Sequence, residues 1–194
     1  LADHVLELGR EVVPKARRGS LSVSISVSVF IPKPHTPFQW CAQLDYEDVK
    51  RRQKLLLESV RNRAVRVHCH DASTSLVEAV LSRMGREAAG LIEGAWRRGQ
   101  RFDAWTEQFN LDNWIAAGEE LGLDLYGIAH EPFDLDALLP WDHVSPGSSK
   151  GFMQREYRRA LAGETTPDCT RASCTGCGVC PTLGVRNVLV GERV

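Results

Sequence analysis

The chain has 194 residues, of which 43% are hydrophobic and 25% are charged, and its 24 basic and 25 acidic residues give a formal net charge of −1. These values are typical of a globular chain with one substantial core, and they exclude a protein that attracts nucleic acid or membranes through its overall charge. The sequence has no apolar run of about 20 residues, so we expect no membrane-spanning helix and a cytoplasmic location. The first residue is Leu rather than Met, which indicates a piece of a longer protein.

The clearest secondary-structure pattern lies near the N-terminus, where a helix predicted over residues 2–13 precedes a strand. In residues 21–31, aliphatic side chains alternate strictly with serines at 22, 24, 26 and 28. The solvent face of a strand usually carries charged residues, whereas this face is uniformly small and hydroxylic. Two interpretations stay open: an edge strand with a wet serine face, or a barrel strand whose serines line a polar interior.

A proline-rich loop follows this strand, with the sequence Phe-Ile-Pro-Lys-Pro-His-Thr-Pro-Phe-Gln-Trp at 30–40. Prolines at 32, 34 and 37 fix the backbone and forbid a helix, which predicts a stiff, extended loop. Sheets and barrels of the α/β class place their chemistry at the carboxyl ends of strands. The candidate residues near a cofactor or substrate are therefore Lys33, His35, Thr36, Gln39 and Trp40. A plain proline-stiffened connector is the alternative.

The next two elements are a surface helix and a short strand. Apolar residues at helical spacing predict the helix over 45–60, and its basic cluster at 50–54 is either a solvated face or a nucleic-acid contact. Residues 64–70 alternate in the manner of a second strand. His68 and His70 share one face of it, either as structural residues or as metal ligands.

From residue 72 onwards the pattern becomes helical. Helices are predicted over residues 76–84, 86–98, 104–109, 113–121 and 150–161. Their predicted N-terminal caps are Ser75, with Glu78 completing a capping box, then Asp103, Asp112 and Ser148. Tryptophans 96, 105 and 114 recur nine residues apart, and we expect them to anchor helix packing.

Four of the six cysteines form a cluster with the spacing C-x4-C-x2-C-x2-C: Cys169, Cys174, Cys177 and Cys180. Glycines 176 and 178 let the backbone wrap tightly and turn peptide N–H groups toward sulfur, as a negatively charged cluster requires. The Cys-x2-Cys-x2-Cys-Pro run is similar to half of a bacterial ferredoxin signature, whereas structural zinc more often uses two separated Cys-x2-Cys pairs. The pattern favours an iron–sulfur cluster, with zinc, free thiols or a redox disulfide as alternatives.

Several of these segments together resemble a known family. The serine-faced strand and its Pro-Lys-Pro loop resemble the last barrel strand and following loop of radical S-adenosylmethionine enzymes, in the branch with an N-terminal cobalamin-binding domain. Phe-Asp-Ala-Trp at 102–105, Leu-Pro-Trp-Asp-His at 139–143 and the cysteine run resemble the C-terminal extension of one family in that branch. The resemblance covers about residues 10 to 190. It departs from the family pattern at Arg-Met-Gly-Arg (83–86) and at Val-Ser-Pro-Gly-Ser-Ser (144–149).

The resemblance implies an α/β, mostly helical fold: the last strands of a partial TIM-type (β/α) barrel over 1–70, a helical extension over 71–165 and a cluster-binding tail over 166–194. It implies a 4Fe–4S cluster, with zinc as the alternative, at the four tail cysteines. Loop residues 33–40 would line the mouth of the barrel. The substrate of the implied radical chemistry stays unknown.

The Cys-x3-Cys-x2-Cys motif that binds the S-adenosylmethionine-cleaving cluster in such enzymes is absent from this chain, in which Cys41 and Cys69 stand alone. We therefore expect S-adenosylmethionine and cobalamin to bind to an upstream part of the same polypeptide, and this chain alone to be inactive. The alternative from another class is a non-catalytic, zinc-stapled module. It would bind RNA or a protein partner through basic residues at 50–54 and 97–101.

Overall fold

The computed structural model describes residues 2–12 and 21–187. It is a mixed α/β chain in which helices predominate, and the described residues include one two-stranded parallel sheet. The predicted α/β, mostly helical class is therefore confirmed. The first helix, α1 (Ala2–Val12), agrees with the prediction up to residue 12, and residue 13 lies outside the described residues. None of the described helices is both long and apolar enough to cross a membrane.

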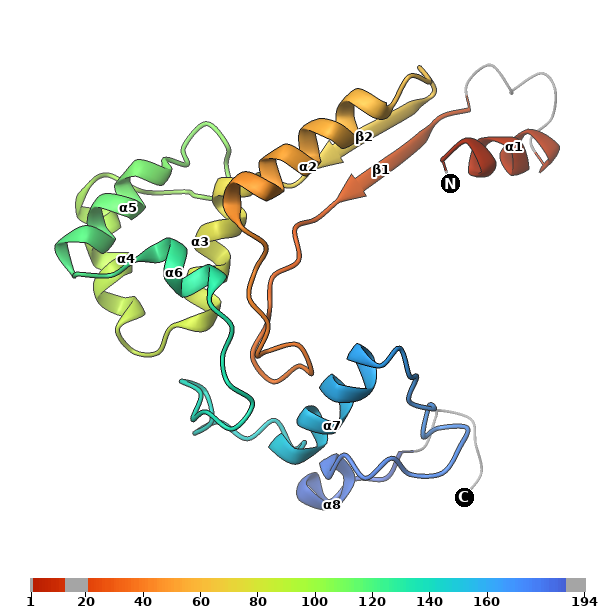
Figure 1. The fold of residues 1–194 in the computed structure, drawn as a ribbon, viewed down its shortest axis with the longest axis vertical. Helices are drawn as coiled ribbons and strands as arrows, with labels where there is room; N and C mark the ends of the chain where they lie inside the picture. Colours follow the sequence, from red (N-terminus) through yellow and green to blue (C-terminus); the bar gives the residue numbers. More distant parts are fainter. Residues whose placement is uncertain (1, 13–20, 188–194) are drawn as a thin grey trace.

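The sheet consists of β1 (Val23–Val27) and β2 (Val65–Cys69), joined along the chain by α2 (Tyr46–Ser59). Val23 pairs with Val65 and Val27 with Cys69, and α2 runs alongside the strands (Figure 1). The serines of β1 are exposed on the same face as Arg66 and His68 of β2. Both predicted strands are confirmed. β1 has five residues rather than the expected eleven, because its partner offers five residues for pairing.

The basic cluster of α2 neutralises acidic side chains on its own helix. Lys50 pairs with Glu47 at 3.4 Å and Arg51 with Asp48 at 2.6 Å, while Lys54 lies 3.9 Å from Glu58. Asp45 caps the helix by accepting the N–H groups of residues 47 and 48. These exposed pairs favour the solvated face over a nucleic-acid contact for this cluster.

A helical bundle forms the main core. It contains α3 (Ala72–Arg83), α4 (Ala88–Arg97), α5 (Leu111–Glu120) and α6 (Leu125–His130). Buried apolar side chains from all four helices meet there, including Leu76, Val80, Leu91, Trp114, Ala117, Leu125 and Ala129. A Cβ added at Gly94 of α4 would lie 3.1 Å from the Cβ of Ala117, so a residue without a side chain lets α4 and α5 approach closely.

The helix starts differ from the predicted caps. Asp71, not Ser75, caps α3 by accepting the N–H of Thr74 at 2.8 Å, and Ser75 is buried inside the helix. Asn110, not Asp112, caps α5, and Ser149, not Ser148, caps α7 (Lys150–Leu161). In each case the capping side chain must immediately precede the first helical residue, so that it reaches the N–H groups two or three residues on.

The predicted helix over 104–109 is wrong, because these residues form turns. The side chain of Asp103 does not cap a helix. Its two oxygens instead accept the indole N–H of Trp114 at 3.0 Å and the amide of Gln100 at 2.6 Å. The short helix α6, for which sequence analysis predicted no element, completes the core through Leu125 and Ala129.

The prediction of three tryptophan anchors holds for Trp114 and is wrong for the other two. Trp114 is buried in the core, whereas Trp96 and Trp105 are 54% and 63% exposed. Trp96 lies on the outer face of α4, with the guanidinium of Arg101 5.0 Å from its ring centroid. The nine-residue spacing therefore does not place these side chains on one packed surface.

A second, aromatic cluster connects the proline-rich loop to α7. Trp40, Leu139 and Trp141 are buried together, and Met153 and Tyr157 of α7 pack against them. The peptide N–H of Phe133 donates to the carbonyl of Trp40 at 2.9 Å. The last helix of the described residues, α8 (Val179–Leu183), contains Cys180, the last cysteine of the run, and lies near α7 in Figure 1.

Candidate functional site

The proline-rich loop begins beyond the carboxyl end of β1 and folds into two consecutive turns. The hydroxyl of Thr36 donates to the carbonyl of Lys33 at 2.8 Å, and the N–H of Gln39 donates to the carbonyl of Thr36 at 3.1 Å. His35 adopts a left-handed φ of 56°, a conformation that is uncommon for a residue with a side chain. The surrounding contacts must therefore hold this turn in place.

The five predicted loop residues go to different places. Trp40 belongs to the buried aromatic cluster, and Thr36 serves the turn itself. Lys33 reaches α3, where its ammonium lies 2.6 Å from Glu78 and 3.1 Å from the hydroxyl of Ser82. His35 and Gln39 line a common cavity. The structure therefore brings two of the five expected residues together.

This cavity, which we call the loop cavity, has a volume of about 160 Å³. It lies between the proline-rich loop and the segment that leads into α7. Its polar lining consists of His35, Gln39, Asp142, Ser145, Ser148 and Lys150. Sequence analysis noted the Leu-Pro-Trp-Asp-His segment at 139–143 and the Val-Ser-Pro-Gly-Ser-Ser segment at 144–149 but did not connect them to the loop, because about one hundred residues separate them from it along the chain.

Gln39 is the best-buried polar residue of the loop cavity, with 3% of its surface exposed. Its Oε1 accepts two hydrogen bonds, from the indole N–H of Trp141 at 2.7 Å and from the backbone N–H of His35 at 3.0 Å. Both partners are obligatory donors, so they fix which end of the carboxamide is oxygen. The side chain thus connects the proline-rich loop to the 139–143 segment.

An ion pair forms the other wall of the cavity. The ammonium of Lys150 lies 2.6 Å from Asp142 Oδ2 and donates to the carbonyl of Ala137 at 2.6 Å. Burial alone would raise the pKa of Asp142, but the hydrogen bonds from Lys150 and from the N–H of Leu139, together with the charge of Lys150, bring the pKa below its ordinary value. Asp142 is therefore ionised at neutral pH.

The cysteine tail carries hydrogen bonds to sulfur. The peptide N–H of Gly176 donates to Cys174 Sγ at 3.4 Å, and the side-chain amide of Asn187 donates to Cys169 Sγ at 3.0 Å. Gly176 and Gly178 have φ values of 71° and 93°, which a residue with a side chain rarely adopts. The expected role of the two glycines, a tight wrap with a peptide group turned toward sulfur, is present at Cys174.

The tail is attached to the segment that lines the loop cavity. The N–H of Ser149 donates to the carbonyl of Cys177 at 3.0 Å. A Cβ at Gly178 would lie 3.4 Å from the carbonyl oxygen of Gly147, so the two backbones pass close to each other. Residues 145–149 therefore contact the loop cavity on one side and the cysteine run on the other.

None of the six cysteines forms a disulfide within the described part of the chain, and among the tail cysteines Cys177 and Cys180 are half-buried. Within residues 2–12 and 21–187, no three His, Cys, Asp or Glu side chains lie close enough together to hold a metal ion; this includes His68 and His70. Binding one ion or cluster through all four tail cysteines would require the tail to draw their sulfur atoms together. Such coupling of metal binding to folding is common, because preformed sites are rare without the metal.

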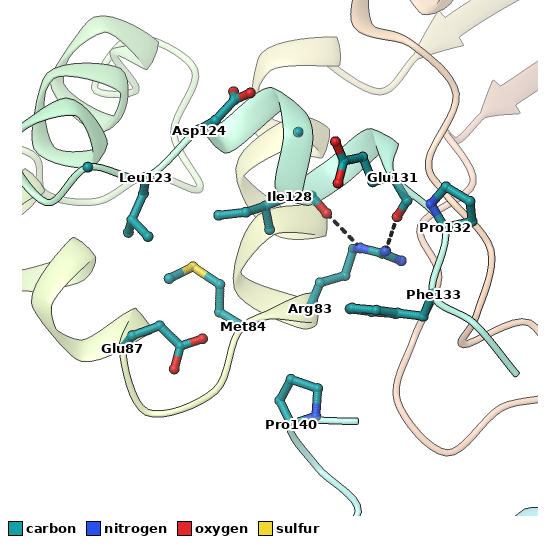
Figure 2. Close-up of a pocket in the computed structure, with 12 residues that line it drawn as sticks. Arg83, Met84, Glu87, Leu123, Asp124, Ile128, Glu131, Pro132, Phe133 and Pro140 are labelled. Atoms are coloured by element: carbon teal, nitrogen blue, oxygen red, sulfur yellow. Dashed lines mark hydrogen bonds between the residues drawn. The ribbon is translucent and has the colours of Figure 1, made fainter. Parts of the chain in front are cut away.

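A second cavity, of about 510 Å³, lies beside α6 and is organised by Arg83 (Figure 2). The guanidinium of Arg83 is buried and donates to three backbone carbonyls, those of Cys41 at 2.5 Å, Ile128 at 2.7 Å and Glu131. It also lies 4.1 Å from the ring centroid of Phe133. Sequence analysis noted residues 83–86 but did not identify this arginine, whose partners are peptide groups distant in sequence.

The contacts of Arg83 indicate a structural role, not a binding or catalytic one. The carbonyl of Cys41 lies just after the proline-rich loop, and those of Ile128 and Glu131 lie in α6 and at its end. One side chain of α3 therefore connects this helix to the loop and to α6. Burial lowers the pKa of Arg83 from its ordinary value, and an arginine still remains protonated at neutral pH. The second cavity therefore contains a charge that is already satisfied by the backbone.

Comparisons of the chain with protein-family models, with curated proteins and with solved structures found no match.

Proposed function

We propose that this chain is the C-terminal region of a radical S-adenosylmethionine enzyme of the cobalamin-associated branch, and that its cysteine tail binds an auxiliary iron–sulfur cluster. S-adenosylmethionine and cobalamin would bind to an upstream part of the same polypeptide, which would also supply most of a (β/α) barrel. The observation that carries the proposal is the cysteine tail, whose peptide and amide groups already donate to sulfur and which is attached beside the loop at the end of β1.

The sheet supports the barrel part of this proposal. A strand, a helix and a second strand parallel to the first form the repeating unit of a (β/α) barrel. Parallel sheets normally have both faces covered, whereas here the face with the β1 serines, Arg66 and His68 is exposed. A polar barrel interior would cover that face. The proline-rich loop, which follows β1, would then lie at the mouth of the barrel, where such folds place their chemistry.

The residues of the tail fit an iron–sulfur cluster. Four thiolates are the usual ligand set, and hydrogen bonds to sulfur stabilise the negative charge of a cluster. Cys169, Cys174, Cys177 and Cys180 would hold it, with Gly176 and Asn187 as donors to two of the sulfur atoms. A bound cluster would supply electron transfer or a point of attachment for substrate. The chain itself would position the cluster, since the hydrogen bond from the N–H of Ser149 to the carbonyl of Cys177 holds the cysteine run beside the loop cavity.

Metal and sulfide analysis of the anaerobically purified chain, together with its absorption spectrum, tests this proposal. We expect about four irons and four sulfides per chain. The Cys174→Ser and Cys177→Ser variants should lose most of the iron. Cys41→Ser and Cys69→Ser, which change cysteines outside the tail, are the matched controls and should retain it. A colourless protein with one zinc would contradict the cluster and favour the zinc-stapled module.

A second candidate function, RNA binding by a non-catalytic module, is favoured by one surface feature. At the end of α4 and in the segment that leads to α5, Trp96, Phe102 and Trp105 are 54%, 74% and 63% exposed, and the guanidinium of Arg101 lies over the ring of Trp96. Exposed aromatic rings interleaved with arginines are typical of surfaces on which single-stranded bases stack.

A salt-titrated gel-shift assay with single-stranded RNA tests this second candidate. Binding through this surface should weaken steeply with salt, and replacing Trp96 or Trp105 by Ala should each reduce affinity about tenfold. The control is Leu138→Ala, which removes an exposed apolar side chain outside this surface. Equal binding by all four proteins, or no binding at low salt, would remove RNA as the partner of this surface.

A further inference from the structure

We propose that the loop cavity is a binding site for a small oxyanion, namely a carboxylate or phosphate group of a ligand. This inference concerns residues 35–39 and 142–150 and does not depend on what the cysteine tail binds. It is based on an amide donor of a buried residue that has no protein partner, on the helix that begins at the cavity and on the local balance of charge.

The first argument is the carboxamide of Gln39. Its oxygen is occupied by the N–H groups of Trp141 and His35, at 2.7 and 3.0 Å. Among the described residues, its Nε2 donates no hydrogen bond, although the residue is 97% buried and lines the loop cavity. This atom is not one of the fully buried side-chain atoms without a partner, so water reaches it. A ligand oxygen in the cavity would accept its N–H groups in place of water.

The second argument is the position of α7. This 12-residue helix begins at Lys150, and both Ser148 and Lys150 line the cavity. Ser149 caps the N–H of Phe152 at 3.2 Å, but the first two helical N–H groups, those of Lys150 and Gly151, have no intrahelical acceptor. The positive end of the helix dipole and these free donors favour an anion beside the helix start.

The third argument is charge. Asp142 is the one carboxylate among the polar lining residues, and the Lys150 ammonium at 2.6 Å balances it. One oxygen of Asp142, Oδ2, accepts hydrogen bonds from the ammonium of Lys150 and from the backbone N–H of Leu139. With that pair neutral, the cavity retains an amide donor, serine hydroxyls, the His35 ring and a helix N-terminus. This surplus of donors matches a group that carries several acceptor oxygens.

The volume limits the size of the ligand group. About 160 Å³ is roughly the space of five water molecules. Cavities that enclose a whole drug-sized molecule measure about 300–1,000 Å³. The loop cavity therefore suits a single carboxylate or phosphate group, with the rest of the ligand outside the cavity.

Titration of the isotope-labelled chain, followed by NMR, tests the proposal with three probes: inorganic phosphate, acetate and acetamide. Phosphate or acetate should shift the side-chain NH2 signals of Gln39 and the backbone amide signals of Lys150 and Gly151 in a saturable way. The anion that saturates at the lower concentration identifies the source as phosphate or carboxylate. Acetamide, a neutral isostere of acetate, should leave these signals without a saturable shift.

The Gln39→Glu variant makes the test specific. It keeps an oxygen to accept Trp141 and His35 but replaces the Nε2 donor by a charged oxygen, so affinity for the anion should fall about tenfold or more. Gln108→Glu is the matched control, because it adds the same charge at an exposed position outside the cavity. If the Gln39 variant does not fold, the titration of the unaltered chain with the three probes still tests whether the cavity binds an anion.

Three results would overturn the proposal. These are the absence of a saturable shift with both anions, equal binding of acetamide and acetate, or unchanged anion affinity in a folded Gln39→Glu variant.

Discussion

The helical core and the cysteine tail obtain their structure from different interactions. In the core, helices α3 to α6 bury Leu76, Val80 and Leu91 almost completely, and their apolar contacts cross from helix to helix. From residue 164 to residue 187, side chains are mostly exposed, and the contacts that fold the tail are peptide hydrogen bonds and N–H groups directed at sulfur.

This difference indicates where each region gets its stability. Fixing the backbone of one residue costs about 1–2 kcal/mol, and burial of apolar surface is the main term that offsets this cost. The core has such burial, whereas the tail has little. A segment of that kind usually requires a disulfide or a metal to stay folded. In line with the proposed function, we propose that the tail depends on a ligand for its cysteines, whereas the core does not.

The largest expected effect of a single substitution lies in the core. Leu91→Ala should destabilise the chain by about 2–5 kcal/mol, because Leu91 is fully buried and its removal leaves a cavity. Leu183→Ala in α8, where the side chain is 58% exposed, should change stability by less than about 0.5 kcal/mol. Urea unfolding followed by far-ultraviolet circular dichroism measures both. Equal effects at the two leucines would remove the contrast between core and tail.

A somewhat smaller effect is expected at Arg83. Arg83→Met keeps most of the side-chain volume but leaves the carbonyls of Cys41, Ile128 and Glu131 without their donor, which should cost about 3 kcal/mol. Arg97→Met removes an exposed arginine paired with Glu93 and should cost less than about 1 kcal/mol. Thermal unfolding of the two variants measures this difference. A small effect at Arg83 would show that the loop and α6 are held together by other contacts.

The buried indole of Trp114 makes one polar contact, a hydrogen bond to Asp103, that we expect to stabilise the fold. Trp114→Phe keeps most of the ring packing but removes the N–H that Asp103 accepts at 3.0 Å, so a loss of about 1 kcal/mol is expected. Trp105→Phe, at an exposed position, should be neutral. Chemical unfolding measures both changes. A neutral result for Trp114→Phe would mean that Asp103 does not need this donor.

The smallest effect concerns pH. Because the folded-state pKa of Asp142 lies below its ordinary value, its stabilising contribution is complete above about pH 4, the pKa of an unfolded aspartate, and is lost as the pH falls through the lower, folded-state pKa. Asp142→Asn should therefore reduce stability at pH 7 by up to about 1 kcal/mol and flatten the acid limb of the stability curve. Asp134→Asn, an exposed position, is the control. A larger effect of the Asp142 variant at pH 3 than at pH 7 would contradict this sign.

Local patterns in the sequence were sufficient for several elements. The alternation of serine and valine predicts β1, and apolar spacing with a preceding serine predicts the helix that is observed as Lys150–Leu161. Each of these patterns lies within a single helix or strand, so no residue distant in sequence is needed to recognise it. The mixed, mostly helical class follows from them.

The remaining features depend on partners distant in sequence. Asp103 was expected to cap a helix, but the indole of Trp114 occupies its carboxylate and the following residues form turns. Gln39 meets Trp141 across 102 residues, and Arg83 meets carbonyls 42 to 48 residues away. Such contacts arise from packing and have no local signature, so neither the loop cavity nor the cavity beside Arg83 could be predicted from the sequence.

Hydrogen exchange with and without metal tests the contrast between core and tail most directly. The amides of Ser149, Gly176 and Val185 report on the tail, and that of Leu91 reports on the core. In anaerobically prepared, metal-loaded protein, both groups should be protected. Removal of the metal should reduce tail protection by about 100-fold or more and leave Leu91 unchanged. Tail amides that keep their protection without metal would contradict the account, because the tail would then fold without a ligand for its cysteines.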